Sequence, residues 1–213
     1  MQAISLWIKI PCTLFVAVLI PVYWIRYGAE NFLWFSDMAL FGTVAGLWLG
    51  SSLLVSMMAV GVLLFDLVWS VAFFLSLIRG AAAEGLVGYM FDPRISLSIR
   101  ALSLFHLALP ALQLWTLGKL GYAHRAWKYQ AVLGWTLLMV TYAVSDPQEN
   151  INWVFGVADI SQKWLPPLLY LVALMVIYPV VVCYPTHRLL KKFFAPTRRP
   201  LNRFPGVDMW RGQ

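Results

Sequence analysis

Charge is scarce in this chain. Only 12% of its 213 residues are Asp, Glu, Lys or Arg, whereas 61% are hydrophobic and the mean hydropathy is +0.74. A soluble domain is about half apolar and about a quarter charged, so the composition excludes an ordinary soluble protein. The 11 Trp and 9 Tyr residues fit a protein that meets two membrane–water interfaces, where these side chains are enriched.

Cysteine and histidine are also scarce, which excludes several kinds of site. The two cysteines, Cys12 and Cys183, each lie inside an apolar run, so they predict neither a disulfide framework nor a metal-binding pair. Of the three histidines, His124 and His187 stand beside basic residues, which argues against a multi-histidine metal or haem centre. The chain contains no phosphate-binding loop, dinucleotide fingerprint, nucleophile elbow or zinc-protease motif. We therefore expect no metal and no cofactor.

Long apolar runs dominate what is present, and we assign six of them as membrane spans, each judged against the roughly 20 helical residues that a crossing needs. We therefore expect an all-α fold, a polytopic membrane helix bundle with six transmembrane helices, over residues 1–187. A basic, aromatic tail follows over residues 188–213. The six runs are Ile4–Ile25, Trp34–Gly50, Leu53–Ile78, Ala101–Gly118, Gln130–Val144 and Leu165–Tyr184.

The second run carries a glycine at every fourth position, Gly42, Gly46 and Gly50. Small residues at this spacing let two helix backbones approach closely, so another helix, with the third run as the candidate, should pack flush against it. Gly50 is followed by Ser51 and Ser52, and these residues tolerate a tight turn. The second and third runs are therefore predicted to form a helical hairpin.

The distribution of Lys and Arg predicts the orientation of the bundle. The tail between Arg188 and Arg211 holds 7 of the 16 Lys and Arg residues. Because cytoplasmic flanks are enriched in these residues, we expect the C-terminus in the cytoplasm. With six spans the N-terminus is cytoplasmic too, and a bacterial inner membrane is the expected location. The rest of the chain offers no basic face, so no nucleic-acid partner is expected.

The tail also alternates basic with aromatic residues, a pattern that predicts contact with an anionic leaflet. Each Lys or Arg near such a surface contributes about 1 kcal/mol. An ordinary positive-inside tail has the same composition, and the two interpretations are compatible. The residues expected at the leaflet are Arg188, Lys191, Lys192, Arg198 and Arg199.

Asp66 is the only ionisable residue in the third run. A charge at the centre of the hydrocarbon costs ~3 kcal/mol on insertion scales, so Asp66 must be protonated, paired with an Arg or His, or placed in a cavity. Two interpretations of Asp66 remain open: a structural polar contact between helices, and a functional site. Asp37 opens the second run, where a carboxylate either stabilises the helix N-terminus or belongs to a site.

The fourth run has the most informative local pattern. Pro110 has no N–H group, so the carbonyl of His106 loses its helical partner and a kink is expected there. Ser103, His106 and Gln113 fall on one helix face. A histidine in this setting can act as a general base, a proton relay or a ligand. The alternative is a buried histidine with a purely structural role, whose hydrogen bonds are made within the protein.

In the predicted topology, polar residues from separate segments converge on the outer half of the bundle. Asp92 precedes Pro93 in an outer loop, and Asn150 and Asn152 lie in another. This convergence predicts a polar cavity that opens outwards, with Asp66 at mid-depth. The candidate catalytic residues are His106, Asp66 and Asp37, and the candidate binding residues are Asn152, Gln113, Ser103 and Asp92.

The order of these features resembles the six-span family of androgen-induced transmembrane hydrolases and its relatives, the transmembrane acyltransferases of phospholipid remodelling. The similar pieces are the Phe32–Asp37 segment that enters the second run and the His106–Pro110 segment of the fourth. The resemblance implies that His106 works on lipid esters. Trp34 stands where the hydrolases have a threonine nucleophile, and the acyltransferases use a cysteine, so the family nucleophile has no counterpart here.

Three classes of function remain open. The first is a non-catalytic accessory or scaffold subunit that binds other membrane proteins, lipid or pigment, with a larger membrane-protein complex as one setting. The second is an intramembrane lipid-ester hydrolase or acyltransferase, which requires a carboxylate within hydrogen-bond reach of His106. The third is a small transporter with Asp66 as its ion or proton site.

Overall fold

The computed structural model describes residues 4–79, 85–157 and 160–194. The protein is all-α, with 80% of the described residues in helices. Within the described residues the only strands are β1 (Gly156–Val157) and β2 (Ile160–Ser161), which pair antiparallel at one end of the molecule.

Each of the six predicted runs coincides with a helix or a helical pair. Three short segments are 3₁₀ helices: Glu30–Leu33, Gly85–Met90 and Ile151–Trp153. The Tyr178–Cys183 segment is π-helical. The helices are α1 (Leu6–Tyr27), α2 (Phe35–Leu49), α3 (Ser52–Arg79), α4 (Leu97–Leu102), α5 (Phe105–Leu120), α6 (Ala126–Val144), α7 (Pro167–Ile177) and α8 (Tyr184–Phe193).

Among the described residues, four helical stretches are long and apolar enough to cross a membrane, and α2 is apolar but shorter. This composition is compatible with an integral membrane protein. The four stretches are Leu6–Tyr27, Ser52–Arg79, Leu97–Leu120 and Pro167–Phe193.

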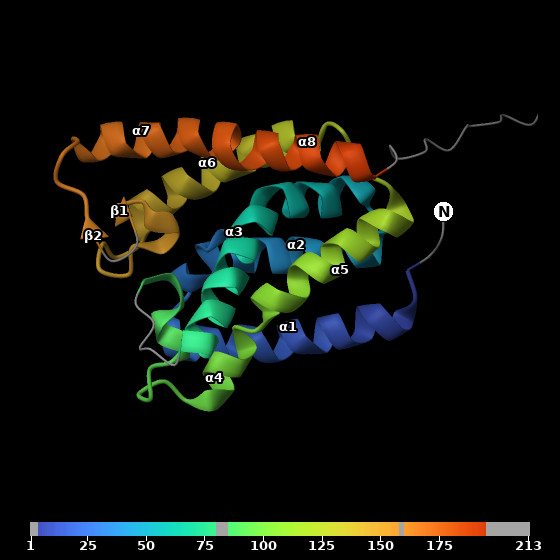
Figure 1. Ribbon diagram of the computed structural model, residues 1–213, viewed down its shortest axis with the longest axis horizontal. Coiled ribbons are helices and arrows are strands. Elements are labelled where there is room, and N and C mark those ends of the chain that lie inside the picture. The colour runs from blue at the N-terminus through green and yellow to red at the C-terminus, as the bar shows by residue number, and fades with distance from the viewer. Residues whose placement is uncertain (1–3, 80–84, 158–159, 195–213) are drawn as a thin grey trace, which may run out of the picture.

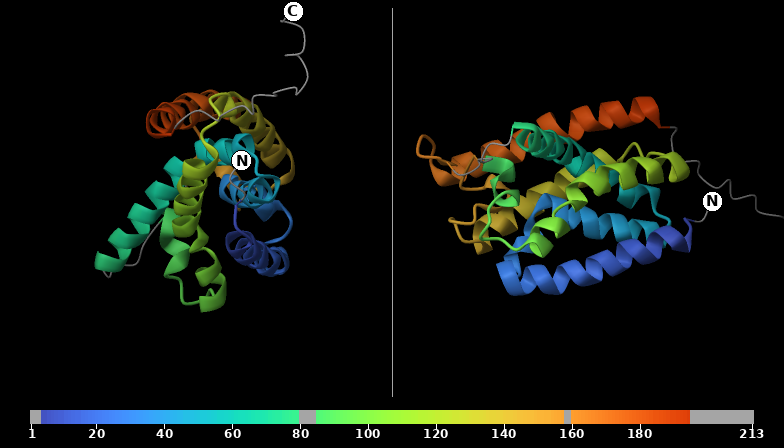
Figure 2. Two further views of the ribbon diagram at one scale, coloured as in Figure 1. Left: turned by 90° about the vertical axis from the view of Figure 1, so that its right-hand side faces the viewer. Right: turned by 60° about the horizontal axis from the view of Figure 1, so that its bottom comes forward.

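Helix α3 is the centre of the bundle. It packs against α2, α5 and α6, whereas α1 lies at one edge and the α7–α8 rod at the other (Figure 1). The apolar window of α3 is 44% buried and that of α1 only 11%, so α1 presents most of its apolar surface outwards. The start of α1 and the end of α8 lie at the same end of the bundle (Figure 2).

The predicted hairpin of α2 and α3 is confirmed. Gly50 ends α2 in the left-handed conformation, with φ of 59°, which glycine adopts without steric cost. A Cβ atom added to Gly42 would collide with the Met58 side chain, and one added to Gly46 would collide with Val55. The glycine stripe therefore serves close packing of α2 on α3, as its spacing predicts.

The fourth run is broken one turn earlier than Pro110 predicts. Its two helices, α4 and α5, meet at Ser103 and Leu104, where the backbone makes 3₁₀-type bonds such as His106 N–H to the Ser103 carbonyl. Pro110 itself lies inside α5. The tight turn just before His106 starts a new helix there, so the imidazole stands in the first turn of α5.

Pro179 lies in the π-helical segment of the last helical rod. Pro179 cannot donate to the carbonyl of Met175, four residues earlier. The indole N–H of Trp135 on α6 donates to that carbonyl instead, at 2.6 Å. The predicted boundary between residues 187 and 188 falls inside α8, which places Arg188, Lys191 and Lys192 on a helix. Arg198, Arg199 and the other residues of the predicted tail from 195 onwards lie outside the described residues.

Candidate functional site

His106 and Asp66 are hydrogen-bonded to each other between α5 and α3. The Nδ1 atom of His106 lies 2.8 Å from Oδ1 of Asp66. The Asp66 side chain is 1% exposed and that of His106 15%. When Asp66 is ionised it accepts a hydrogen bond from Nδ1–H of His106, and the Nε2 atom of a neutral imidazole then carries the lone pair. This is the arrangement that orients a histidine as a general base.

Aromatic rings fix the imidazole of His106. Trp69 stacks on it with ring centroids 4.8 Å apart, and Phe105 does so at 4.2 Å. Trp69 follows Asp66 by three residues, so one face of α3 supplies both the carboxylate and the stacked ring. The imidazole is therefore held by contacts on its ring faces and by the hydrogen bond of Nδ1. Its other nitrogen, Nε2, is then the atom that can exchange a proton with a substrate or with water.

A second buried carboxyl group lies near this pair. Asp37 stands in the first turn of α2 and is 3% exposed, and it is close enough to Asp66 that the two carboxylates would repel each other if both were ionised. Within the described residues, Oδ1 of Asp37 and Oδ2 of Asp66 have no hydrogen-bond partner. Buried polar atoms are nearly always satisfied, so these two oxygens are available to a bound proton, water or substrate.

Two tyrosines that the sequence does not single out complete the polar cluster. The Tyr23 hydroxyl of α1 lies 2.9 Å from Oγ of Ser103. Tyr89 lies beside Ser103 and Trp69, and burial raises the pKa of Tyr89 to about 12, so its hydroxyl stays protonated. The chain has nine tyrosines, and nothing in its local pattern distinguishes these two.

Gln113 belongs to a separate contact. Its Nε2 atom donates to Oγ1 of Thr43 on α2 at 3.1 Å, and its side chain is fully buried. Gln113 follows His106 by seven residues on α5, a rise of about 10 Å. Ser103, His106 and Gln113 therefore meet different partners, and Ser103 lies in the break that precedes α5.

Asn152 connects segments of the backbone. Its Oδ1 accepts the N–H of Phe35 at 3.0 Å, and its Nδ2 donates to the Leu33 carbonyl at 2.8 Å and to Thr141 at 3.3 Å. These bonds use the side-chain amide to hold the N-terminal end of α2, the helix that carries Asp37. Asn152 has φ of 53°, a conformation that Asn tolerates better than most residues.

Asp92 forms an ion pair within its own turn. Its carboxylate lies 2.8 Å from Nη2 of Arg94, and it also accepts the backbone N–H of Arg94. These hydrogen bonds lower the pKa of Asp92 to about 2. In the described part of the chain, Asp92 makes no hydrogen bond with Asp66 or His106.

Two cavities lie outside the cluster and do not enclose it. An apolar groove of about 460 Å³ runs between α1 and the α4–α5 segment, and Phe105 is among its walls. A more polar pocket of about 400 Å³ lies at the loop end, lined by residues that include Glu30, Asp146 and Glu149. Asp66 and His106 line neither of these two cavities.

Comparisons with family models, with curated proteins and with solved structures find no match to this chain. The fold and composition therefore define its class, a helical bundle compatible with an integral membrane protein. The function is therefore inferred from the geometry of the polar cluster, which consists of Asp66, His106, Asp37, Tyr23, Tyr89 and Ser103.

Proposed function

We propose that the protein is a membrane-embedded hydrolase of lipid esters in which His106 is the general base and Asp66 orients it. The observation that carries this proposal is the 2.8 Å contact between Nδ1 of His106 and Oδ1 of Asp66. A pair that served only to join two helices would not require an imidazole held on its faces by Trp69 and Phe105.

The reaction needs no nucleophilic side chain. Nε2 of His106 removes a proton from water, and the water oxygen forms a bond to the acyl carbon of the ester. The bond between that carbon and the alcohol oxygen then breaks, and the alcohol oxygen takes the proton from His106. Asp66 stabilises the transient imidazolium. A lipid alcohol in place of water would give acyl transfer by the same steps.

The membrane placement is part of the proposal. Six helical rods, with both described ends of the chain at one end of the bundle, support six crossings with N- and C-termini on the same side. The basic residues of α8, including Arg188 and Lys191, support a cytoplasmic position for that side, in a bacterial inner membrane. His106 and Asp66 are then at mid-depth, with Tyr23 and Asn152 towards the outer face.

Hydrolysis of lipid esters by purified protein in nanodiscs tests the proposal. We expect turnover of phospholipid or acylglycerol esters by the native chain, and a loss of about 10²–10⁴-fold in His106→Ala. His124→Ala is the matched control, because His124 lies away from the cluster, beside Tyr122 and His187. Native-like activity in His106→Ala, with both variants folded, would refute the proposal.

A non-catalytic accessory subunit that binds other membrane proteins, lipid or pigment is the second candidate. Large exposed aromatic side chains favour it, including Trp7, Trp24 and Trp164 at 88%, 58% and 72% exposure. Affinity purification in mild detergent distinguishes the two functions. A subunit is recovered with a stoichiometric partner and hydrolyses no ester, whereas the enzyme migrates alone and is active.

A transporter is the third candidate, favoured by one oxygen of Asp37 and one of Asp66 that have no hydrogen-bond partner among the described residues. Two buried carboxyl groups that interact are a plausible proton or cation site in a membrane. Proton-coupled uptake in proteoliposomes that is abolished in Asp66→Asn, without ester hydrolysis, would support this candidate over the enzyme.

A further inference from the structure

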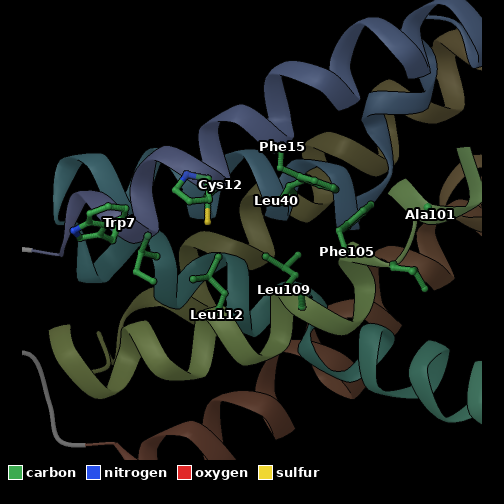
Figure 3. Close-up of a pocket in the computed structure, with 12 residues that line it drawn as sticks. Trp7, Cys12, Phe15, Leu40, Ala101, Phe105, Leu109 and Leu112 are labelled. Carbon is green, nitrogen blue, oxygen red and sulfur yellow. The ribbon is translucent and has the colours of Figure 1, made fainter. Parts of the chain in front are cut away.

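An apolar groove opens along one side of the bundle, between α1 and α5 (Figure 3). Helix α1 packs mainly on α2 and on the Glu30–Leu33 segment, and the groove lies between it and α5. Its volume of about 460 Å³ is in the range of sites for small ligands. Trp7, Cys12 and Phe15 line it from α1, and Phe105, Leu109 and Leu112 from α5.

The chemistry of the walls selects a hydrocarbon occupant. None of the described residues that line the groove is charged, and both walls belong to stretches that are apolar enough to span a membrane. A polar ligand would lose its hydration there without gaining hydrogen bonds. An acyl chain would replace contact with lipid tails by contact with the close-packed walls.

The groove adjoins the His106–Asp66 pair at one end. Phe105 lines the groove and also stacks on the imidazole, with centroids 4.2 Å apart. From Phe15, which contacts Phe105, to Trp7 the helix rises about 12 Å. One leaflet of hydrocarbon is ~15 Å deep, half of a ~30 Å core. The groove is therefore about as long as the part of an acyl chain that one leaflet accommodates.

We propose that this groove binds the acyl chain of the lipid whose ester is cleaved, with the acyl carbon beside His106 and the methyl end towards Trp7. This inference rests on the proposed hydrolase. The alcohol part of the lipid then lies on the opposite side of His106, near Tyr23 and Ser103, where hydroxyl groups are available. The depth of the groove beyond Phe105 sets the preferred length of the chain.

Cys12 is well placed to test this assignment. Its sulfur points from α1 into the groove, towards Leu109 and Leu112 (Figure 3). Replacing Cys12 by Trp would fill the middle of the groove and shorten the space for a chain. Val18 is the matched control on the same helix, because it is 55% exposed and is not among the lining residues.

The first experiment measures occupancy without catalysis. An ether-linked hexadecyl phospholipid with a diazirine at the chain end is photolysed in nanodiscs with the His106→Ala protein, and the labelled residues are mapped by mass spectrometry. We expect label concentrated at Trp7, Cys12 and Leu112, and lost in Cys12→Trp but not in Val18→Trp. Equal labelling of other exposed apolar residues, such as Val18 and Val176, would overturn the proposal.

The second experiment measures chain selection. Cys12→Trp should lower the ratio of kcat/KM for palmitoyl over octanoyl esters by about tenfold or more, the discrimination that a filled apolar pocket gives. An unchanged ratio would overturn the acyl-site assignment while leaving the hydrolase intact. Concentrated groove labelling in a protein that cleaves no ester would instead refute the hydrolase, and with it the assignment of the bound chain as substrate.

Discussion

Asp66 of α3 and His106 of α5 share a hydrogen bond of 2.8 Å in the interior of the bundle. The contact joins the central helix to the helix whose first turn carries the imidazole. It offsets the free-energy cost of placing Asp66 in an apolar segment, because a carboxylate there must have a partner. The same contact gives His106 the orientation that a general base needs.

Double-mutant analysis measures how strongly the two side chains interact. We expect Asp66→Leu and His106→Leu each to lower the free energy of unfolding, because each leaves a buried polar group alone. The double variant should lose less than the sum, with an interaction energy of about 1 kcal/mol, typical of polar contacts between membrane helices. Reversible unfolding in mixed micelles provides the measurement. Strictly additive losses would show that the pair contributes nothing to stability.

Gly46→Ala should destabilise the hairpin of α2 and α3. The new Cβ atom would lie 2.6 Å from Cγ2 of Val55, so the helices must separate, at a cost of about 1–3 kcal/mol. Gly118→Ala is the control, because its nearest neighbour is a ring carbon of Phe194 at 4.0 Å. The control should be neutral or gain up to about 1 kcal/mol in helix propensity. Equal unfolding midpoints for the two variants would contradict this packing.

Asn152→Ala removes three hydrogen bonds that end on Phe35, Leu33 and Thr141. We expect a loss of about 1–3 kcal/mol in the free energy of unfolding, because buried backbone groups at the start of α2 lose their partner. Gln148→Ala, at an exposed position in the same loop, should change stability little. Thermal unfolding in detergent compares the two. A native-like midpoint for Asn152→Ala would show that water replaces the amide.

Trp135→Phe keeps an aromatic ring on α6 but removes the indole N–H. The carbonyl of Met175, which Pro179 leaves without a helical partner, would then be unsatisfied. We expect a loss of about 1–3 kcal/mol in the free energy of unfolding. In Trp135→Phe combined with Pro179→Ala, an alanine N–H becomes available to that carbonyl, so stability should recover. If stability does not recover in the double variant, the loss in Trp135→Phe comes from the packing of the larger indole ring and not from the hydrogen bond.

The Asp92–Arg94 pair predicts a local pH dependence. The hydrogen bonds from Arg94 hold the folded pKa of Asp92 at about 2, below the value of about 3.9 in an unfolded chain. A depressed carboxyl pKa adds stability that is present above about pH 4 and is lost as the pH falls through about 2. In Arg94→Gln, the pKa of Asp92, followed by carboxyl carbon NMR, should rise towards about 3.9. An unchanged pKa would rule out Arg94 as the cause.

Local sequence patterns were sufficient to predict the positions of the helices and part of how they pack. The apolar runs locate the helical rods, because about 20 apolar residues need an internally bonded backbone in hydrocarbon. Gly42, Gly46 and Gly50 indicate both a close helix contact and the turn that follows. The break at Ser103 was placed incorrectly at Pro110, because 3₁₀ bonds before His106 absorb the bend.

The sequence by itself determined that this chain is helical and apolar, and that Asp66 needs a partner, because burying an isolated charge is costly wherever the helices lie. Only the tertiary structure decided which residue that partner is. Asp66 and His106 are 40 positions apart, and their contact depends on how α3 and α5 are rotated against each other. The same packing brings Tyr23 to Ser103 and opens the groove beside Phe105, which no local pattern encodes.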